Sequence, residues 1–252
     1  MTLAGQHAFV TGGGRGIGRA IAAALARAGA AVTVIGRSEA PLRETVAAGE
    51  AAGCGVAEVT DMVEVKRQVT AAQAARGPIA ILINNAGSVE TGPFIKTDPS
   101  VFRTMWNVHL MGAVYATQAV LPGMIERGFG RIVNVASTAG LKGYAYISAY
   151  CAAKHALVGL TRALAAETAA RGVTVNAVCP GYTDTDLVRD SIERVAAKTG
   201  RAQADVLAEY AKDAPIGRLI RPEEVAAAVV YLCSPEAAAV TGTTLAIAGG
   251  EI

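Results

Sequence analysis

Charged and aromatic residues are scarce in this sequence, and long apolar runs are missing. Charged residues make up 17% and aromatic residues 5% of the 252 residues, and the formal net charge is only +2. So small a charge gives no electrostatic basis for binding nucleic acid or a membrane surface. The unbroken apolar run near the end, 225–233, is far shorter than the roughly 18 residues that a membrane span requires. A buried helix is the better interpretation of that run.

Cysteine is scarce as well. The four cysteines, Cys54, Cys151, Cys179 and Cys233, are scattered and form no C-x-x-C pair. This spacing indicates reduced, buried side chains, so we expect neither disulfides nor a metal site. Met1 leads almost directly into a strand-like run and a glycine loop. We therefore expect no signal peptide and a cytoplasmic protein.

The order of apolar patterns predicts an α/β fold. No Pro/Gly/Ser-rich linker or block of charge divides the chain, so we expect one domain, 1–252. Short β-branched runs alternate with amphipathic stretches, which predicts a parallel sheet with helices on both faces. Strands are expected at 7–11, 31–36, 55–59, 79–84, 131–137, 173–179 and 243–249, and helices at 16–29, 39–52, 62–76, 99–127, 149–171 and 222–233. The polar, charged segment 183–214 breaks this rhythm and is interpreted as a lid over a pocket.

A glycine-rich turn joins the first expected strand to the first expected helix. Gly12, Gly16 and Gly18 have the spacing T-G-x-x-x-G-x-G, and Ile17 stands where G-x-G-x-x-G would need a third glycine. Glycines allow close approach of a pyrophosphate, and the N-terminus of the following helix attracts its charge. A tight structural turn is the alternative, but the place between strand and helix favours a dinucleotide site.

Two arginines favour NADP(H) over NAD(H). The second expected strand ends at Gly36 and Arg37 with no carboxylate at its tip, and Arg15 lies inside the glycine loop. Two guanidinium groups suit the 2′-phosphate of NADP(H). Glu39 is close enough to favour NAD(H) instead. Arg37 could also merely stack on adenine while Arg15 stays in solvent.

Ser137, Tyr150 and Lys154, with Asn107 upstream, form the most informative set of residues. Tyr150 and Lys154 are four apart in an apolar, helix-like stretch, so a phenol and an ammonium share one helical face. Ser137 closes the strand-like run RIVNVAS. A hydroxyl donor, a phenol and a cation in one cleft are what ketone reduction or alcohol oxidation requires.

Taken together, these motifs resemble the short-chain dehydrogenase/reductase family. The resemblance rests on TGGGRGIG, NNAG at 84–87, Asn107, Ser137, YCAAK and PGYTDT, which follow in this order along the whole chain. It implies a Rossmann-like, doubly wound, seven-stranded parallel sheet. It also implies hydride transfer at C4 of a nicotinamide and usually a homotetramer.

The resemblance implies a role for each matching residue. Tyr150 would be the catalytic acid/base, with its pKa lowered by Lys154, and Ser137 would donate to the substrate oxygen. Asn107 would hold a water that links Lys154 to solvent as a proton relay. The cofactor would contact Gly12, Arg15, Gly16, Ile17, Gly18, Arg37, Glu58, Val59, Asn85, Ala86, Gly87, Tyr150, Lys154, Pro180, Gly181, Thr183 and Thr185.

Three further residues need separate interpretation. Glu58 stands where the family commonly has an Asp that bonds the adenine amino group, and its longer side chain would do so less rigidly. His109 follows Asn107 by two, and His155 directly follows Lys154. Neither histidine has neighbours suited to bind a metal, so both are interpreted as structural.

The expected function is NAD(P)-dependent interconversion of a secondary alcohol and a ketone, with a small-molecule substrate. The lid residues Arg189, Arg194, Lys198 and Arg201 are either a solvated face or a landing site for a carrier phosphate such as that of coenzyme A. In the second case the substrate would be a 3-oxoacyl thioester. The main alternative function is a non-catalytic NADP(H)-binding sensor or scaffold, which would not need the four active-site residues together.

Overall fold

The computed structural model describes residues 2–212 and 214–252 and is built on one parallel sheet. The sheet has seven strands in the order β3-β2-β1-β4-β5-β6-β7. The strands are β1 His7–Thr11, β2 Ala31–Gly36, β3 Gly53–Val56, β4 Ile79–Asn84, β5 Gly130–Val135, β6 Val173–Pro180 and β7 Thr244–Ile247. The chain reverses its direction of travel across the sheet between β1 and β4, which is where such folds bind ligands. The predicted single, doubly wound, Rossmann-like domain is confirmed.

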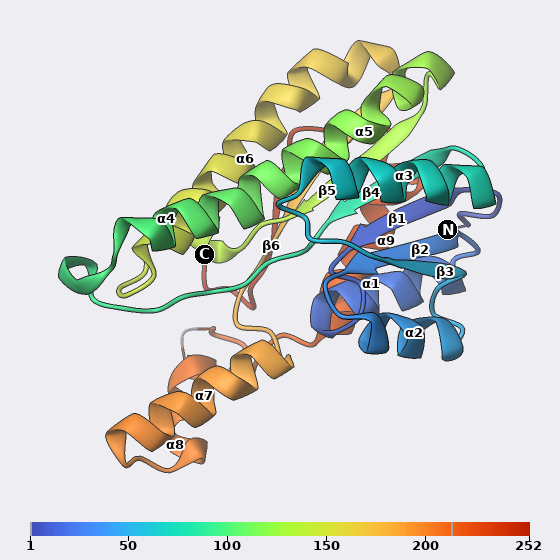
Figure 1. Cartoon of the computed structure of the whole chain (residues 1–252). Coiled ribbons are helices and arrows are strands. Elements are labelled where there is room, and N and C mark those ends of the chain that lie inside the picture. Colours follow the sequence, from blue (N-terminus) through green and yellow to red (C-terminus); the bar gives the residue numbers. More distant parts are fainter. Residues whose placement is uncertain (1, 213) are drawn as a thin grey trace.

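Helices cover both faces of the sheet (Figure 1). One face packs against α1 Gly16–Arg27, α2 Glu39–Ala47 and α9 Pro222–Cys233. The other packs against α3 Met62–Arg76, α5 Gly112–Arg127 and α6 Ser148–Thr168. Because both faces are covered, β1, β4, β5 and β6 are buried at every position, which explains their near-continuous apolar sequences.

The third strand lies earlier than the sequence suggested. β3 is Gly53–Val56, whereas 55–59 was expected. Glycine is a poor strand former and disguised this edge strand. A Cβ at Gly55 would lie 2.1 Å from Oε1 of Gln68, so a larger residue there would displace that side chain. As a result Cys54, expected to be buried, is exposed, and Glu58 lies in the loop after the strand.

The single helix expected at 99–127 is divided into three parts. α4 Pro99–Trp106 and α5 Gly112–Arg127 are joined by a π-helical turn, Asn107–Met111. Such a turn contains an extra residue and changes the rotational phase of the helix. By length and composition the whole segment could cross a membrane. Within this domain, however, α5 packs against α3 and β4, and α4 packs against α6.

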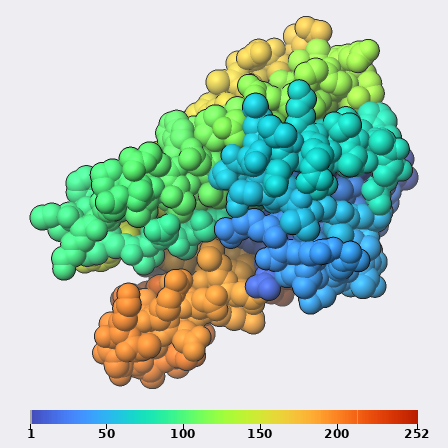
Figure 2. Space-filling view, in the orientation of Figure 1, coloured from blue at the N-terminus to red at the C-terminus, as the bar shows by residue number. Residues whose placement is uncertain are grey.

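The expected lid is a helical hairpin that projects from the sheet. α7 Asp186–Thr199 and α8 Gln203–Lys212 pack on each other around Ile192, Ala196 and Val206. Figure 2 shows the hairpin, in orange, as a lobe at one end of the molecule. Residue 213 of the expected lid lies outside the described residues. Short 3-10 turns complete the chain at Phe94–Lys96, Thr138–Gly140, Ala169–Arg171 and Pro235–Ala237.

Candidate active site

The glycine loop lies at the carboxyl end of β1, beside β4. Gly12 and Gly16 adopt positive φ angles of 68° and 50°. A Cβ at Gly18 would lie 2.2 Å from the carbonyl oxygen of Gly12, so only glycine fits. α1 begins at Gly16 without a side-chain cap or an acidic residue in its first turn. Its first N–H groups therefore remain available to an anion, and the loop fits a pyrophosphate.

Thr11 and Asn85 hold this loop in place. Asn85 Nδ2 donates to the carbonyl oxygens of Thr11 at 3.0 Å and Gly12 at 3.2 Å. The Thr11 hydroxyl accepts from the backbone N–H groups of Asn85 and Ala86 at 3.0 and 3.1 Å. Asn85 therefore acts on the cofactor site through the glycine loop. Thr11 was missed from the sequence, although it is the T of the glycine motif.

A hollow of about 120 Å³ lies next to the loop, at the ends of β2 and β3. It is lined by Gly12, Gly36, Arg37, Ala57, Glu58, Val59, Ala86, Gly87, Ser88 and Val108. Arg37 Nε lies 3.9 Å from Glu58 Oε2, so this arginine stands at the rim of the hollow. Glu39, which could have favoured NAD(H), instead pairs with Arg43 on its own helix at 2.6 Å. Arg15 is exposed in the glycine loop.

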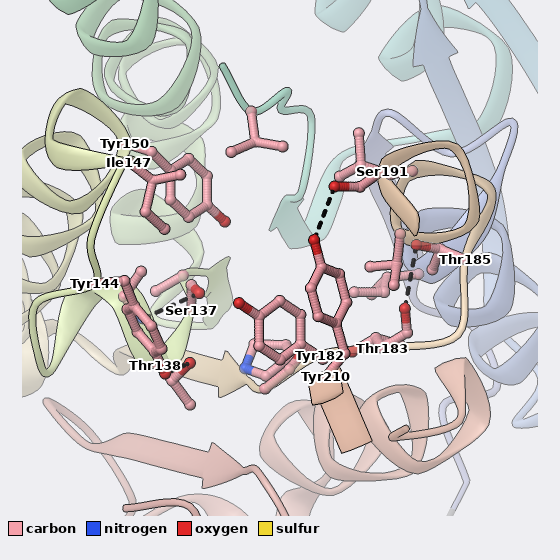
Figure 3. Close-up of a pocket in the computed structure, with 18 of the residues that line it drawn as sticks. Ser137, Thr138, Tyr144, Ile147, Tyr150, Tyr182, Thr183, Thr185, Ser191 and Tyr210 are labelled. Carbon is pink, nitrogen blue, oxygen red and sulfur yellow. Dashed lines mark hydrogen bonds between the residues drawn. The ribbon is translucent and has the colours of Figure 1, made fainter. Parts of the chain in front are cut away.

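A second pocket of about 190 Å³ opens at the carboxyl ends of β5 and β6, beneath the lid hairpin (Figure 3). The described residues of its walls carry hydroxyl groups, aromatic rings and aliphatic side chains, and none of them is charged. The lining residues are Ile17, Val89, Thr91, Ala136, Ser137, Thr138, Ala139, Tyr144, Ile147, Tyr150, Pro180, Gly181, Tyr182, Thr183, Thr185, Leu187, Val188, Ser191 and Tyr210. The pocket therefore suits an uncharged group.

Ser137 and Tyr150 line this pocket, and Lys154 lies beside the Tyr150 ring. Ser137 follows β5, and its Oγ accepts from the Ala139 N–H at 3.1 Å. Figure 3 shows the hydroxyls of Ser137 and Tyr150 on the same side of the cavity. Lys154 Nζ lies 5.5 Å from the centre of the Tyr150 ring and donates to the Val135 carbonyl at 2.7 Å. The spacing of four in α6 thus places phenol and amine together, as the sequence suggested.

Burial sets the protonation of Tyr150 and Lys154. Desolvation raises the pKa of Tyr150 to about 12, and its hydrogen bond with Ser137 offsets only part of this shift. Desolvation also lowers the pKa of Lys154 to about 7. In the protein alone, burial therefore outweighs the expected effect of Lys154 on the tyrosine. The phenol stays protonated near neutral pH, where Lys154 exchanges its proton readily.

The structure does not bring Asn107 to this cluster. Asn107 begins the π-helical turn and is exposed, whereas His109 is buried. The His109 ring packs edge-on against Tyr150, with the ring centres 5.1 Å apart. Residues two apart on a helix point to nearly opposite sides, so only one of them can face Lys154. The placement expected for Asn107 is therefore wrong, and His109 takes that place.

Most of the basic lid residues already have partners on the lid. Arg189 Nε lies 2.8 Å from Asp184 Oδ1, and Arg201 Nη1 lies 2.6 Å from Glu209 Oε2. Arg194 Nε donates to the backbone carbonyl of Asp190 at 3.1 Å. These contacts favour the interpretation of the three arginines as part of a solvated face.

Several known proteins are similar to this chain over nearly its whole length. A family model described as short chain dehydrogenase matches residues 6–196. The chain is 41% identical over 247 residues to 2-(S)-hydroxypropyl-CoM dehydrogenase 3 of Xanthobacter autotrophicus, covering 96% of this chain and 94% of the relative. It is 39% identical over 252 residues to an acetoacetyl-CoA reductase of Shinella zoogloeoides, covering 97% of each.

A solved structure of actinorhodin polyketide ketoreductase with NADPH has a TM-score of 0.93 to this structure, at 36% identity. The match covers 98% of this chain and 97% of that one. The sequence and the fold therefore point to the same family. The chain belongs to the short-chain dehydrogenase family and is an NAD(P)-dependent oxidoreductase that interconverts hydroxyl and keto groups.

Proposed function

We propose that this oxidoreductase uses NADP(H) and acts on an uncharged ketone or the matching secondary alcohol. The observation that carries the proposal is the pocket that presents the Ser137 and Tyr150 hydroxyls and has no charged side chain among its described lining residues. A carbonyl oxygen beside these hydroxyls would accept two hydrogen bonds. The rest of the substrate would contact the rings of Tyr144, Tyr182 and Tyr210, which line the same pocket.

Each of the three residues has a distinct task in this proposal. Tyr150 donates its proton to the carbonyl oxygen during reduction and takes it back during oxidation. Ser137 donates to the same oxygen and stabilises the negative charge that develops there. Lys154, with a pKa of about 7, exchanges a proton with Tyr150 near neutral pH. The nicotinamide cofactor, when bound, supplies or accepts the hydride.

The proposed preference for NADP(H) rests on the hollow of about 120 Å³ beside the glycine loop, which would hold the adenosine half of the cofactor and is called the adenosine hollow here. Arg37 stands at the rim of this hollow, Arg15 lies in the neighbouring glycine loop, and Glu39 is occupied by Arg43. A 2′-phosphate would gain charge-assisted hydrogen bonds from either guanidinium. The ketoreductase with TM-score 0.93 was solved with NADPH.

A 3-oxoacyl thioester is the substrate class to test first. The relative from Shinella zoogloeoides is an acetoacetyl-CoA reductase. A short oxoacyl group is uncharged and suits a pocket of about 190 Å³. Its carrier would lie outside the pocket, near a lid whose Arg189 and Arg201 are already paired with carboxylates. We therefore do not assign a carrier phosphate to those two residues.

A cofactor-oxidation screen tests the proposed function. Acetoacetyl-CoA, a small neutral ketone and a 2-oxo acid of similar size are offered with NADPH and with NADH, and loss of reduced nicotinamide is followed by absorbance. We expect turnover of the neutral ketone or the thioester with NADPH, and poor turnover of the charged acid. If NADPH binds but no ketone reacts, the sensor or scaffold alternative replaces this proposal.

A homotetramer is the proposed assembly. α5 and α6 pack on the same face of the sheet, and Trp106 at the end of α4 is 46% exposed. A large exposed apolar side chain beside long apolar helices fits a subunit interface. Sedimentation equilibrium at micromolar concentration should give the mass of four chains, and a monomer would contradict the proposal. The cytoplasmic location expected from the sequence stays a prediction.

A further inference from the structure

A small cavity lies beside Lys154. Its described lining residues are all different from those of the pocket of about 190 Å³, which is the proposed substrate pocket. The volume of the small cavity is about 10 Å³, close to the space that a single water molecule needs. Polar side chains from four elements line it among apolar ones: Thr11, Asn84, His109 and Lys154. The cavity is therefore polar enough to hold a water.

Two buried acceptors on these residues are unpartnered. Asn84 Oδ1 and His109 Nδ1 have no hydrogen-bond partner among the described residues. The two residues are only 6% and 3% exposed. Asn84 Nδ2 donates to Asn134 Oδ1 at 2.8 Å, which fixes the amide and leaves its oxygen free. A buried acceptor without a donor costs free energy, so a donor is expected at this place.

The contacts of His109 determine its tautomer. Its Nε2 lies 2.7 Å from the carbonyl oxygen of Ser88, which can only accept, so Nε2 carries the proton. Burial, with the nearby charge of Lys154, lowers the pKa of His109 to about 3, and the ring is neutral. Nδ1 is therefore an acceptor. Gly87 confines the ring from another side, because a Cβ there would lie 2.5 Å from His109 Cε1.

Lys154 offers the matching donors. Its side chain is buried, and Nζ donates to the Val135 carbonyl at 2.7 Å. A protonated amine has three N–H groups, so two remain. One water in the cavity would accept from Lys154 and donate to Asn84 Oδ1 and to His109 Nδ1. This arrangement would satisfy both unpartnered acceptors.

We propose that Asn84 and His109 hold a water against Lys154, and that His109 is thereby a positioning residue for the Lys154–Tyr150 pair. The idea rests on the proposed function, because it assumes that Lys154 and Tyr150 exchange protons. His109 Nδ1 accepts a hydrogen bond from the water that Lys154 binds. The His109 ring also packs edge-on against the Tyr150 ring. A hydrogen-bond acceptor favours the charged form of Lys154. With one N–H group on Val135 and one on the water, the orientation of the third N–H group is fixed as well.

The groups that titrate around this cluster are few. Besides burial, the charge of Lys154 lowers the pKa of His109. Cys179 of β6 affects the pKa values of both Lys154 and Tyr150. Cys151, which follows Tyr150 on α6, raises the pKa of the Tyr150 phenol. No carboxylate is among the groups that shift these three pKa values within residues 2–212 and 214–252. A change at His109 should therefore appear directly in the titration of Lys154.

Three variants separate positioning from packing. His109→Phe keeps a ring against Tyr150 but removes the acceptor. His109→Asn places an amide oxygen near the position of Nδ1. His155→Phe is the matched control, because His155 is exposed on α6. With the best ketone from the screen, we expect His109→Phe to lose at least tenfold in kcat with little change in KM. His109→Asn should retain activity within a few-fold, and the control should match the unmodified protein.

A second measurement uses the protein without cofactor and needs no turnover. NMR of ¹⁵N-labelled lysine and histidine should show the Nε2–H tautomer of His109, and a lower Lys154 pKa in His109→Phe than in the unmodified protein. A high-resolution crystal structure should show a water bonded to Asn84 Oδ1 and His109 Nδ1. The proposal would be overturned if kcat falls equally in His109→Phe and His109→Asn. It would also be overturned if the Lys154 pKa does not change in His109→Phe, or if the cavity holds no water. If the unmodified protein also reduces no ketone, it is the proposed function that fails.

Discussion

The hydroxyl of Tyr144 donates a hydrogen bond to the carboxylate of Glu251, 107 residues further along the chain. Tyr144 lines the substrate pocket, and Glu251 lies after β7 with its side chain only 2% exposed. Lys142 Nζ lies 3.1 Å from the same carboxylate. A Cβ at Gly181 would lie 2.8 Å from Glu251 Oε2, so the carboxylate also sits directly behind the pocket. The segment after β7 therefore fixes one aromatic wall of the site.

Glu251→Ala should disturb substrate binding more than chemistry. Tyr144 and Lys142 would lose their shared partner, and the ring of Tyr144 would no longer be held against the pocket. We expect KM for the ketone to rise about tenfold, kcat to change less, and unfolding free energy to fall by about 1–3 kcal/mol. Steady-state kinetics and urea unfolding measure both effects. Glu126→Ala, at an exposed position of α5, is the control. An unchanged KM would contradict this role for Glu251.

Tyr150→Phe should remove the proton donor without removing a cofactor anchor. We expect kcat to fall by about 10²–10⁴-fold, the typical value for a lost general acid. NADPH affinity, measured by fluorescence titration, should stay nearly the same. Tyr146→Phe is the control, since Tyr146 is 67% exposed. Full activity of the Tyr150→Phe protein would remove Tyr150 from the mechanism.

Arg37→Asp should reverse the cofactor preference. The substitution exchanges an attractive charge for a repulsive one at the rim of the adenosine hollow. A lost charge-assisted bond should weaken NADPH binding by roughly 10–100-fold, while NADH binding stays or improves. Calorimetric titration with both cofactors measures this, with Arg67→Asp on the exposed face of α3 as control. Equal affinities for NADPH and NADH in the unmodified protein would show that Arg37 does not read the phosphate.

His109 should make the protein less stable in acid. Its folded pKa of about 3 lies below the ordinary value of 6.5, so between these values the unfolded chain binds a proton that the folded chain does not. Stability therefore rises with pH across this window and is lost as pH falls, by at most about 1.4 kcal/mol per pH unit. Urea unfolding at pH of about 4 and 7 should show a smaller difference for His109→Asn than for the unmodified protein.

The buried His7 also has a lowered pKa and contributes to acid sensitivity. It is present in both proteins, so its effect cancels in their comparison. If both proteins lose equal stability on acidification, His109 is not neutral and buried as described.

The lid hairpin should be the least protected part of the chain. α7 and α8 share only a small apolar cluster around Ile192, Ala196 and Val206, and α8 reaches the rest of the pocket through the stack of Tyr210 on Tyr182. Amide exchange should be fast over 183–212 in the free protein and slow after NADP(H) and a good ketone are added. Equal protection with and without ligands would argue against closure of this segment.

Much of the fold could be predicted because the strand and helix patterns are strong. The bounds of β1, β2 and β4 agree with the expected 7–11, 31–36 and 79–84. The family and the reaction class are confirmed as well, since both rest on several motifs in a fixed order. The position of β3 was predicted wrongly because its glycines do not form an apolar run. The residues just after it, up to Val59, fit a strand pattern better and drew the prediction to 55–59.

The site was harder to predict where distant segments meet. Asn107 was chosen over His109 because the rotational phase of a helix across a π turn is not visible in the sequence. Glu251 has no motif around it, and its partners Tyr144 and Lys142 lie more than a hundred residues away. Such contacts are set by packing of the whole domain rather than by local pattern.

The π-helical turn Asn107–Met111 also limits how this chain can change in length. Deleting one residue there would restore regular α-helical hydrogen bonding, which is locally favourable. It would also turn α4 by about 100° relative to α5, because each α-helical residue adds that rotation. The buried face of α4, with Met105 against α6, would then point away from its partner. Insertions and deletions should therefore be tolerated in the lid hairpin long before they are tolerated in this single turn.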